Sequence, residues 1–252
     1  MLNYPVLFFL FSMLVLWLSA HIGASLRKRR ALKDGEREVF AVVQAATLTL
    51  LGLIIGFSFS MAISRYDLRK TYEEAEANAI GTEYVRAGLL PAADAAGVRA
   101  LLRKYLDLRI SFYRTRDERA LGQINADTAH LQAEMWSAVE VSAAARPTPV
   151  IALAVSGMND VLNSQGYTQA AWWNRIPIAA WGLMMATAIC CNVLVGYGLR
   201  GSEGKRGMLL VLPLVVSISF LLIADIDSPR GGLIHVAPQN LVSLSQSLLP
   251  PK

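Results

Sequence analysis

The sequence predicts an all-α integral membrane protein with four transmembrane helices and a helical bundle domain inserted between the second and the third. The chain is 54% hydrophobic and 17% charged, with a mean hydropathy of +0.40, which is atypical of a soluble domain. Four apolar runs approach the roughly 20 residues that cross a bilayer. Between the second and third runs lies a long polar segment whose apolar residues recur with helical spacing.

The four apolar runs define the expected organisation of the chain. Basic residues follow the first run instead of preceding it, so we interpret this run as an anchor and not as a cleaved signal peptide. Asn192 interrupts the third run, and the fourth contains Pro213, which neighbouring helices can accommodate. The expected spans are residues 5–25, 39–64, 176–199 and 208–226. The corresponding domains are a first helix pair (1–64), an extramembrane helical domain (65–175), a second helix pair (176–227) and a C-terminal tail (228–252).

Charge in the two short loops predicts the orientation in the membrane. Loop 26–38 carries six Lys or Arg against three acids, and loop 200–207 carries three against one. Basic short loops favour the cytoplasmic side. We therefore expect a multi-pass membrane protein whose termini and 65–175 domain lie outside the cytoplasm.

The polar segment 65–175 holds 13 basic and 13 acidic residues, so its net charge is near zero. Its apolar spacing predicts helices throughout, with breaks at Leu90-Pro91 and Arg146-Pro147. The expected helices are a continuation of the second span to about residue 90, then 92–116, 119–145 and 148–163. Nothing in the segment is typical of a strand.

No motif for catalysis or cofactor binding is present. The two cysteines, Cys190 and Cys191, are adjacent in the third span and read as small packing residues. The three histidines are scattered and have no metal-ligand spacing. The net charge of +5 is explained by basic loops. We therefore expect no enzyme activity, metal, cofactor or nucleic-acid partner.

The second span is more polar than anchoring requires. At 100° per residue, small, hydroxyl and selected apolar side chains fall on one face, here called the polar stripe. The stripe consists of Ala46, Thr49, Leu53, Phe57, Ser60 and Ser64. Such a face can line a pore, in which Leu53 or Phe57 closes the path by dewetting. The alternative is that Gly52, Gly56 and the serines only pack helices closely.

Beyond Arg65 the predicted helix continues with many charges. Glu73, Glu76 and Glu83 share one side. The simplest interpretation is a solvated face with i,i+4 ion pairs such as Arg69–Glu73 and Lys70–Glu74. Glu76 and Asn78 have no obvious partner within this stretch.

A second polar patch follows the fourth span. Asp225 and Asp227 precede Pro229, Arg230 and a glycine pair. Two carboxylates before a glycine turn can contribute to a calcium site, but the register of a complete calcium loop is missing. The alternative is capping and turn formation, with an ion pair between Asp227 and Arg230.

Several segments resemble the bestrophin channels and, more closely, the bacterial bestrophin-like family. Gly56-Phe57, the alternating residues 58–64 and Arg65-Tyr66 are similar to the bestrophin neck. EANAIGTEYVRAGLLP (76–91) and ADIDSPRGGLIHVAP (224–238) resemble the bacterial family. The arrangement of two spans, a helical domain and two more spans is also that of bestrophins.

The resemblance implies a homopentameric, anion-conducting channel, with membrane lipid and inorganic ions as its other partners. The second helix would line a hydrophobic neck at Thr49, Leu53 and Phe57, with Ser60 and Ser64 beyond it. Structural or gating roles would fall to Arg65, Glu76, Asn78, Asp225, Asp227 and Arg230.

Two features depart from the bestrophin pattern, and other functions were considered. The acidic calcium clasp of animal members has no clear counterpart, and bestrophin topology would put the large domain in the cytoplasm, against the loop charges. The alternative function is a membrane receptor or binding protein whose helical domain senses a ligand or partner. A transporter would need an inverted repeat, and the two span pairs show none.

Overall fold

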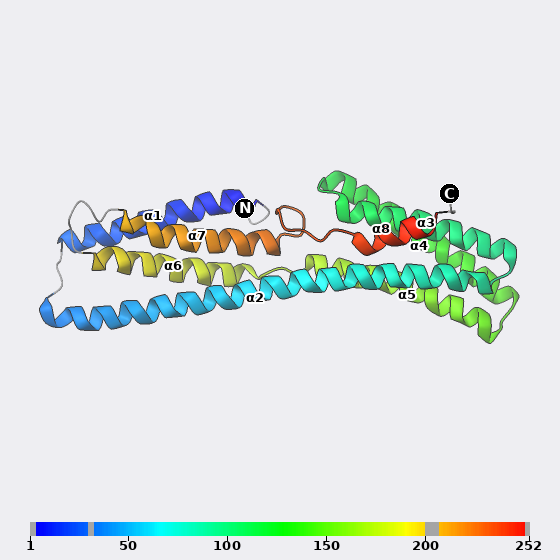
Figure 1. Cartoon of the computed structure of the whole chain (residues 1–252), viewed down its shortest axis with the longest axis horizontal. Coiled ribbons are helices and arrows are strands. Elements are labelled where there is room, and N and C mark those ends of the chain that lie inside the picture. The colour runs from blue at the N-terminus through cyan, green and yellow to red at the C-terminus, as the bar shows by residue number, and fades with distance from the viewer. Residues whose placement is uncertain (1–3, 30–32, 200–206, 250–252) are drawn as a thin grey trace. The chain divides into compact units, whose positions relative to one another are not determined.

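The computed structural model describes residues 4–29, 33–199 and 207–249. All regular elements in these ranges are helices, which confirms the predicted all-α class. Loop residues 200–206 and Arg30, on which part of the charge argument depends, lie outside the described residues. In chain order the elements are α1 (Pro5–Arg29), α2 (Asp34–Arg86), the 3₁₀ turn η1 (Ala87–Leu89), α3 (Ala92–Arg114), α4 (Glu118–Ala145), α5 (Pro149–Trp173), α6 (Ile178–Gly198), α7 (Met208–Asp227) and α8 (Gln239–Ser247) (Figure 1).

The chain divides into two compact units. The first comprises Met1–Arg65 and Arg175–His235, and the second comprises Tyr66–Asn174 and Val236–Lys252. The second unit therefore combines most of the 65–175 segment with the end of the C-terminal tail. α2 is one continuous helix of 53 residues that contributes to both units.

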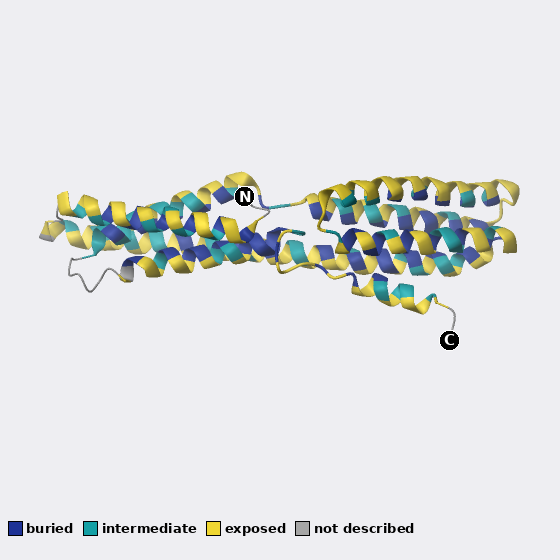
Figure 2. Ribbon diagram, turned by 90° about the horizontal axis from the view of Figure 1, so that it is seen from above, coloured by how far each residue is buried: buried dark blue, intermediate teal, exposed yellow. Residues whose placement is uncertain are grey.

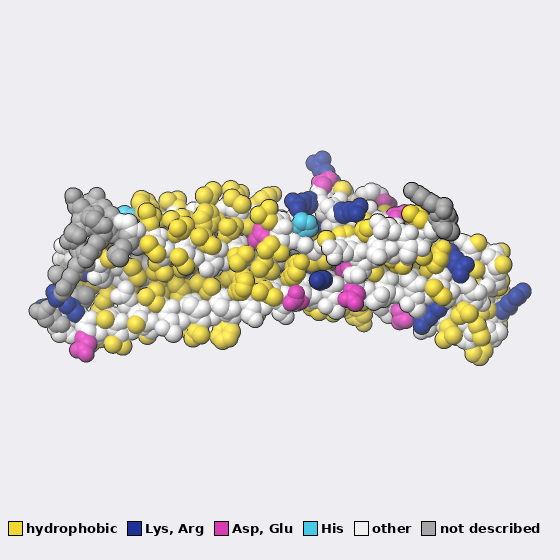
Figure 3. All heavy atoms as spheres, viewed as in Figure 1, with side chains coloured by type: hydrophobic (Ala, Val, Ile, Leu, Met, Phe, Trp, Pro, Cys, Tyr) yellow, Lys and Arg dark blue, Asp and Glu magenta, His cyan; other side chains and the backbone are white. Residues whose placement is uncertain are grey.

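The apolar helices coincide with the predicted spans. Four helical stretches among the described residues are long and apolar enough to cross a membrane by length and composition. They include α1, α6, α7 and the apolar part of α2. Figure 3 shows hydrophobic side chains covering much of the visible face of the first unit, whereas many of the charged side chains lie over the second.

The first unit is built on close packing of α1 against α6 and α7. Gly23 of α1 and Gly196 of α6 lie at the closest approach, where a Cβ on either glycine would collide with a backbone carbonyl of the other helix. Nearer the start of α1, Phe8 packs edge-to-face on Trp181, with ring centroids 5.1 Å apart. Small residues let the backbones of membrane helices approach, and aromatic rings then fill the wider part of the interface.

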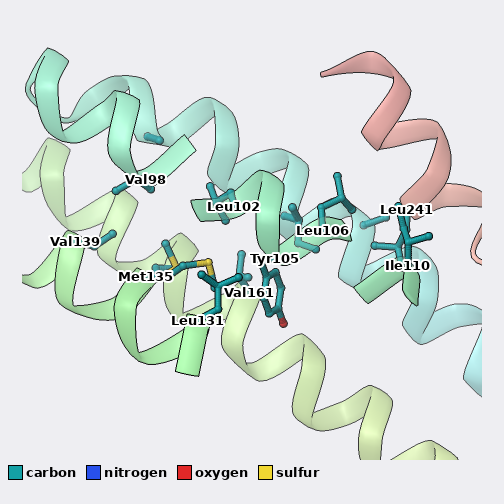
Figure 4. Close-up of a cluster of buried hydrophobic side chains, with 14 of the residues drawn as sticks. Val98, Leu102, Tyr105, Leu106, Ile110, Leu131, Met135, Val139, Val161 and Leu241 are labelled. Atoms are coloured by element: carbon teal, nitrogen blue, oxygen red, sulfur yellow. The ribbon is translucent and has the colours of Figure 1, made fainter. Parts of the chain in front are cut away.

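The second unit has its own hydrophobic core. Figure 4 shows Leu102 and Leu106 of α3, Met135 of α4 and Val161 of α5 as members of one cluster of buried side chains. All four side chains are almost completely buried. Figure 2 shows the same division in both units, with dark-blue buried residues facing neighbouring helices and yellow residues facing outward. Burial of these apolar side chains is the main stabilising contribution.

Local sequence explains the starts of α4 and α5, but the end of α5 differs from the prediction. Asp117 caps α4 by accepting hydrogen bonds from the amides of Arg119 and Ala120, and Thr148 caps α5. However, α5 extends to Trp173, about ten residues beyond its predicted end at 163. Gly166 does not break the helix, because glycine inside a helix costs only about 1 kcal/mol relative to alanine.

Candidate functional site

The polar stripe on α2 is exposed along its length. Phe57 is 70% exposed and Leu53 is 54% exposed, although both are large apolar residues. Thr49, Ser60 and Ser64 are exposed on the same face. Only 6% of the apolar window of α2 is buried, against 33% in α1 and 50% in α7. Within one chain, α2 is therefore the span with the largest unburied surface.

Three residues on the other side of the same span are buried. Leu51, Ser58 and Ala62 are at most 5% exposed. At 100° per residue their common direction is about 150° around the helix from the polar stripe. α2 thus uses one side to pack within its unit and leaves the stripe free.

Gly52 and Gly56 do not make a close helix contact within the described chain. A Cβ built on either glycine meets nothing within 4 Å. The contrast with Gly23 and Gly196 is clear, since those two glycines are enclosed by backbone. The packing role proposed for the G-x-x-x-G pair therefore has no partner among the described residues of the same chain.

Arg65 and Asp227 are brought together where α2 leaves the apolar region. Asp227 is 2% exposed. Its Oδ1 lies 3.5 Å from Nη1 of Arg65, and its Oδ2 lies 3.8 Å from Nε of Arg175. The amide of Ile176 donates to both carboxylate oxygens, at 3.1 and 3.2 Å. The carboxylate of Asp227, at the end of α7, therefore contacts α2 and the residues just before α6. This is a structural role.

Asp225 organises the turn that follows α7. Its Oδ1 and Oδ2 each accept a hydrogen bond of 2.8 Å, from the amides of Leu233 and Ile234 respectively. A Cβ on Gly232 would lie 2.6 Å from the carbonyl oxygen of Asp225, which explains the glycine. Arg230 is half-buried in this turn.

These contacts favour turn formation over calcium binding. Both oxygens of Asp225 and both of Asp227 already accept backbone amides. No group of three or more His, Cys, Asp or Glu side chains has the geometry of a metal site in the described ranges. The two carboxylates replace missing backbone partners at the end of a span, where unpaired amides are costly.

The glutamates of α2 were expected on a solvated face, and this was wrong. Glu73, Glu76 and Glu83 are each 0% exposed. The stretch is amphipathic as predicted, but its acidic side faces α3, α5 and α8 instead of water. A charged group is rarely buried without compensation, so each carboxylate needs a partner or a proton.

Glu76 has the most complete set of partners. Its carboxylate forms an ion pair with the buried guanidinium of Arg109 in α3. It also accepts hydrogen bonds from the Tyr113 hydroxyl at 3.3 Å and from Thr168 Oγ1 at 3.1 Å. Burial, reinforced by the negative charge of Glu76, raises the pKa of Tyr113, so the phenol stays a neutral donor. Glu76 is thus a structural link between α2, α3 and α5.

Glu73 holds the C-terminal helix. Its Oε1 accepts from the amide of Leu241 at 3.0 Å, and its Oε2 accepts from Nδ2 of Asn240 at 2.6 Å. α8 has no side-chain cap of its own at Pro238, so a carboxylate from α2 satisfies the helix N-terminus. Asn78, the other candidate in this stretch, is exposed.

Comparison with known proteins identifies the family. A family model described as the Bestrophin-like domain matches residues 6–241. The chain belongs to the Bestrophin-like family. No curated protein matches the chain.

Solved structures give the same fold. A crystal structure of a variant bacterial bestrophin homologue from Klebsiella pneumoniae aligns with a TM-score of 0.66 at 13% identity, covering 95% of this chain and 97% of that chain. A second variant gives 0.64 at 14% identity, covering 95% and 96%. A zinc-phased structure gives 0.61 at 15% identity, covering 94% and 98%. At these identities the likeness establishes the fold alone.

In this Bestrophin-like chain, sequence reasoning missed the partners of the buried glutamates. Arg109, Tyr113 and Thr168 lie 33 to 92 residues from Glu76, and no local pattern connects them. α8 was also missed, although Leu241, Leu244 and Leu248 have helical spacing and pack on the core. That spacing was the available signal.

Proposed function

We propose that this Bestrophin-like chain is one subunit of a homo-oligomeric ion channel in the bacterial inner membrane, with five copies arranged around a central path. The observation that carries the proposal is the exposed polar stripe of α2. A span whose large apolar and hydroxyl side chains are free in the single chain is suited to face a pathway shared between copies. Family membership supports the same assignment.

The neck of this path would be formed by Thr49, Leu53 and Phe57. Their spacing puts successive side chains on one face, one turn apart. Repeated in every subunit, Phe57 and Leu53 would form apolar rings, which gate ion flow by dewetting. The ring of Thr49 would be less apolar because its side chain carries a hydroxyl, although the proton of that hydroxyl is donated to the carbonyl of Ala45 at 3.0 Å.

Anion preference is supported by the chemistry of the stripe. Rings of Asp or Glu are typical of cation channels. Between Thr49 and Ser64 the stripe carries no carboxylate, and its polar groups are the hydroxyls of Thr49, Ser60 and Ser64. Beyond the span the same face carries the exposed Asp67 before Asn78, so the uncharged part of the stripe ends with the span. The hydroxyls of Ser60 and Ser64 can donate hydrogen bonds to a passing anion, whereas that of Thr49 donates to the carbonyl of Ala45.

The contact between copies would use the flank of the stripe. Gly52 and Gly56 are exposed with open space beside them, and a neighbouring helix could approach closely there. Exposed apolar side chains on α1 and α7, such as Leu14 and Val215, would face lipid. The partners are therefore further copies of the chain, membrane lipid and the conducted ions.

Purified protein in planar bilayers tests the proposal. We expect a chloride-gradient-dependent current from the unmodified protein and a changed single-channel conductance in Phe57→Ala. Phe11→Ala is the matched control, because Phe11 is also an exposed phenylalanine, at 42%, but lies on α1. Absence of any current, or equal conductance in the wild type and Phe57→Ala, would contradict the proposal.

A further inference from the structure

Glu83 differs from the other buried glutamates because it has no hydrogen-bond partner. The side chain lies in the second unit, near the end of α2, and is 0% exposed. Neither Oε1 nor Oε2 has a donor among the described residues. A buried, ionised carboxylate without donors is strongly disfavoured, whereas the neutral acid is much less so.

The opposing surface of α5 is shaped around this carboxyl group. Gly157 lies directly across from it, and a Cβ at Gly157 would collide with Oε2 of Glu83. The same Cβ would lie 3.0 Å from Cδ of Arg86. Glu83 and Arg86 therefore both pack on a position of α5 that has no side chain.

The nearby charges only partly compensate a negative Glu83. Arg86, from the same helix, lies within one turn, but its Nη1 also pairs with Oδ2 of Asp160 in α5, at 3.8 Å. Arg86 and Asp160 are the charged groups that act on Glu83 from α2 and α5. Burial raises the pKa of Glu83 from its ordinary 4.5 to about 8, with Arg86 opposing the rise and Asp160 adding to it.

We propose that Glu83 is a proton-responsive contact between α2 and α5. The neutral acid packs against Gly157, and ionisation of Glu83 weakens the contact because no donor among the described residues bonds its two oxygens.

The direction of the pH effect follows from proton linkage. The folded protein binds this proton more tightly than the unfolded chain, so the contribution to stability is complete below about pH 4.5 and is lost as pH rises to about 8. Mildly alkaline pH should loosen α2 from α5 near Glu83. If α2 lines a pore, as the proposed channel function requires, conductance should change over the same range.

Difference infrared spectroscopy tests the protonation state directly. Wild-type protein should show the carbonyl band of a protonated carboxyl group at pH 6 that disappears as pH is raised through about 8. Glu83→Gln should lack this titrating band, while Glu74→Gln should keep it, because Glu74 is an exposed glutamate of the same helix. A wild-type spectrum identical to that of Glu83→Gln throughout would overturn the proposal.

Two further variants make the test independent of any single substitution. Arg86→Gln removes the opposing positive charge and should move the midpoint of the titrating band up by about one pH unit. Asp160→Asn removes the negative charge and should move it down by a similar amount. Midpoints that do not move in either variant would also overturn the proposal.

Bilayer currents separate this inference from the channel assignment. A band that titrates as expected, together with a protein that passes no current, would leave the proton-responsive contact intact and contradict the channel. A current whose pH profile does not depend on Glu83, in a protein without the titrating band, would support the channel and contradict the proton-responsive contact.

Discussion

At the scale of single residues, the buried carboxylates of α2 have three different solutions to the same problem. Glu76 is neutralised by Arg109, Glu73 accepts the amide of Leu241 in α8, and burial raises the pKa of Glu83 to about 8, which favours its neutral form. Each solution removes the cost of an uncompensated buried charge. Together these interactions explain how the glutamate side of α2 can be buried beyond Arg65.

Removing one member of the Glu76–Arg109 pair should be severe. Glu76→Gln leaves the guanidinium of Arg109 buried without its counter-charge, so we expect the free energy of unfolding to fall by about 3–5 kcal/mol. Glu74→Gln, on the exposed side of the same turn, should change it by less than about 0.5 kcal/mol. Thermal unfolding of the detergent-solubilised proteins provides the measurement, and equal melting temperatures for the two variants would contradict this role of Glu76.

The same residues show why the candidate site was only partly predictable. Thr49, Leu53 and Phe57 were found because helical periodicity is a local property that can be counted along the chain. The burial of Glu76 could not be found in this way, because the side chains that compensate its charge come from α3 and α5. A row of glutamates has the same sequence pattern whether it faces water or distant partners.

At the scale of helices, the long apolar helices were predictable because a bilayer span requires about 20 apolar residues, which can be counted along the chain. The ends of extramembrane helices were less predictable. α5 passes Gly166 without a break, and α8 depends on Glu73 from another helix for its cap. Local turn signals therefore identified helices but missed boundaries that tertiary contacts decide.

The α1–α6 contact provides a test at this scale. Gly196→Ala would place a methyl group against the carbonyl of Ala20, and overpacking of this kind costs about 1–3 kcal/mol. Gly182→Ala, at an open position of the same helix, should be neutral or slightly stabilising. The comparison requires only melting temperatures. If Gly182→Ala lowered the melting temperature as much as Gly196→Ala, the close approach of the α1 and α6 backbones would not be the cause of the destabilisation.

At the scale of the whole molecule, a pathway lined by α2 requires several copies of the chain. One chain leaves the polar stripe of α2 exposed, and large exposed apolar surfaces mark contact with lipid or with another protein. Light scattering of solubilised protein should give five times the chain mass of 27.5 kDa after subtraction of detergent. A mass of one chain would exclude a pathway shared between copies.

Orientation is a separate property of the whole molecule. The basic loop 26–38 favours a cytoplasmic position for that loop and a periplasmic C-terminus. A periplasm-dependent reporter enzyme fused after Lys252 should therefore be active. An inactive periplasmic reporter together with a fluorescent cytoplasmic one at the same position would establish the opposite topology, which the bestrophin resemblance implies.

The central claim is that the polar stripe of α2 lines the ion path, and chemical modification at Phe57 tests it most directly. The experiment uses Phe57→Cys in a background with Cys190→Ser and Cys191→Ser, because the native cysteines are free thiols. Current in a planar bilayer is recorded before and after a charged thiol reagent. We predict a large change of current for Phe57→Cys and none for Phe11→Cys. Unchanged current in fully modified Phe57→Cys protein would contradict the claim.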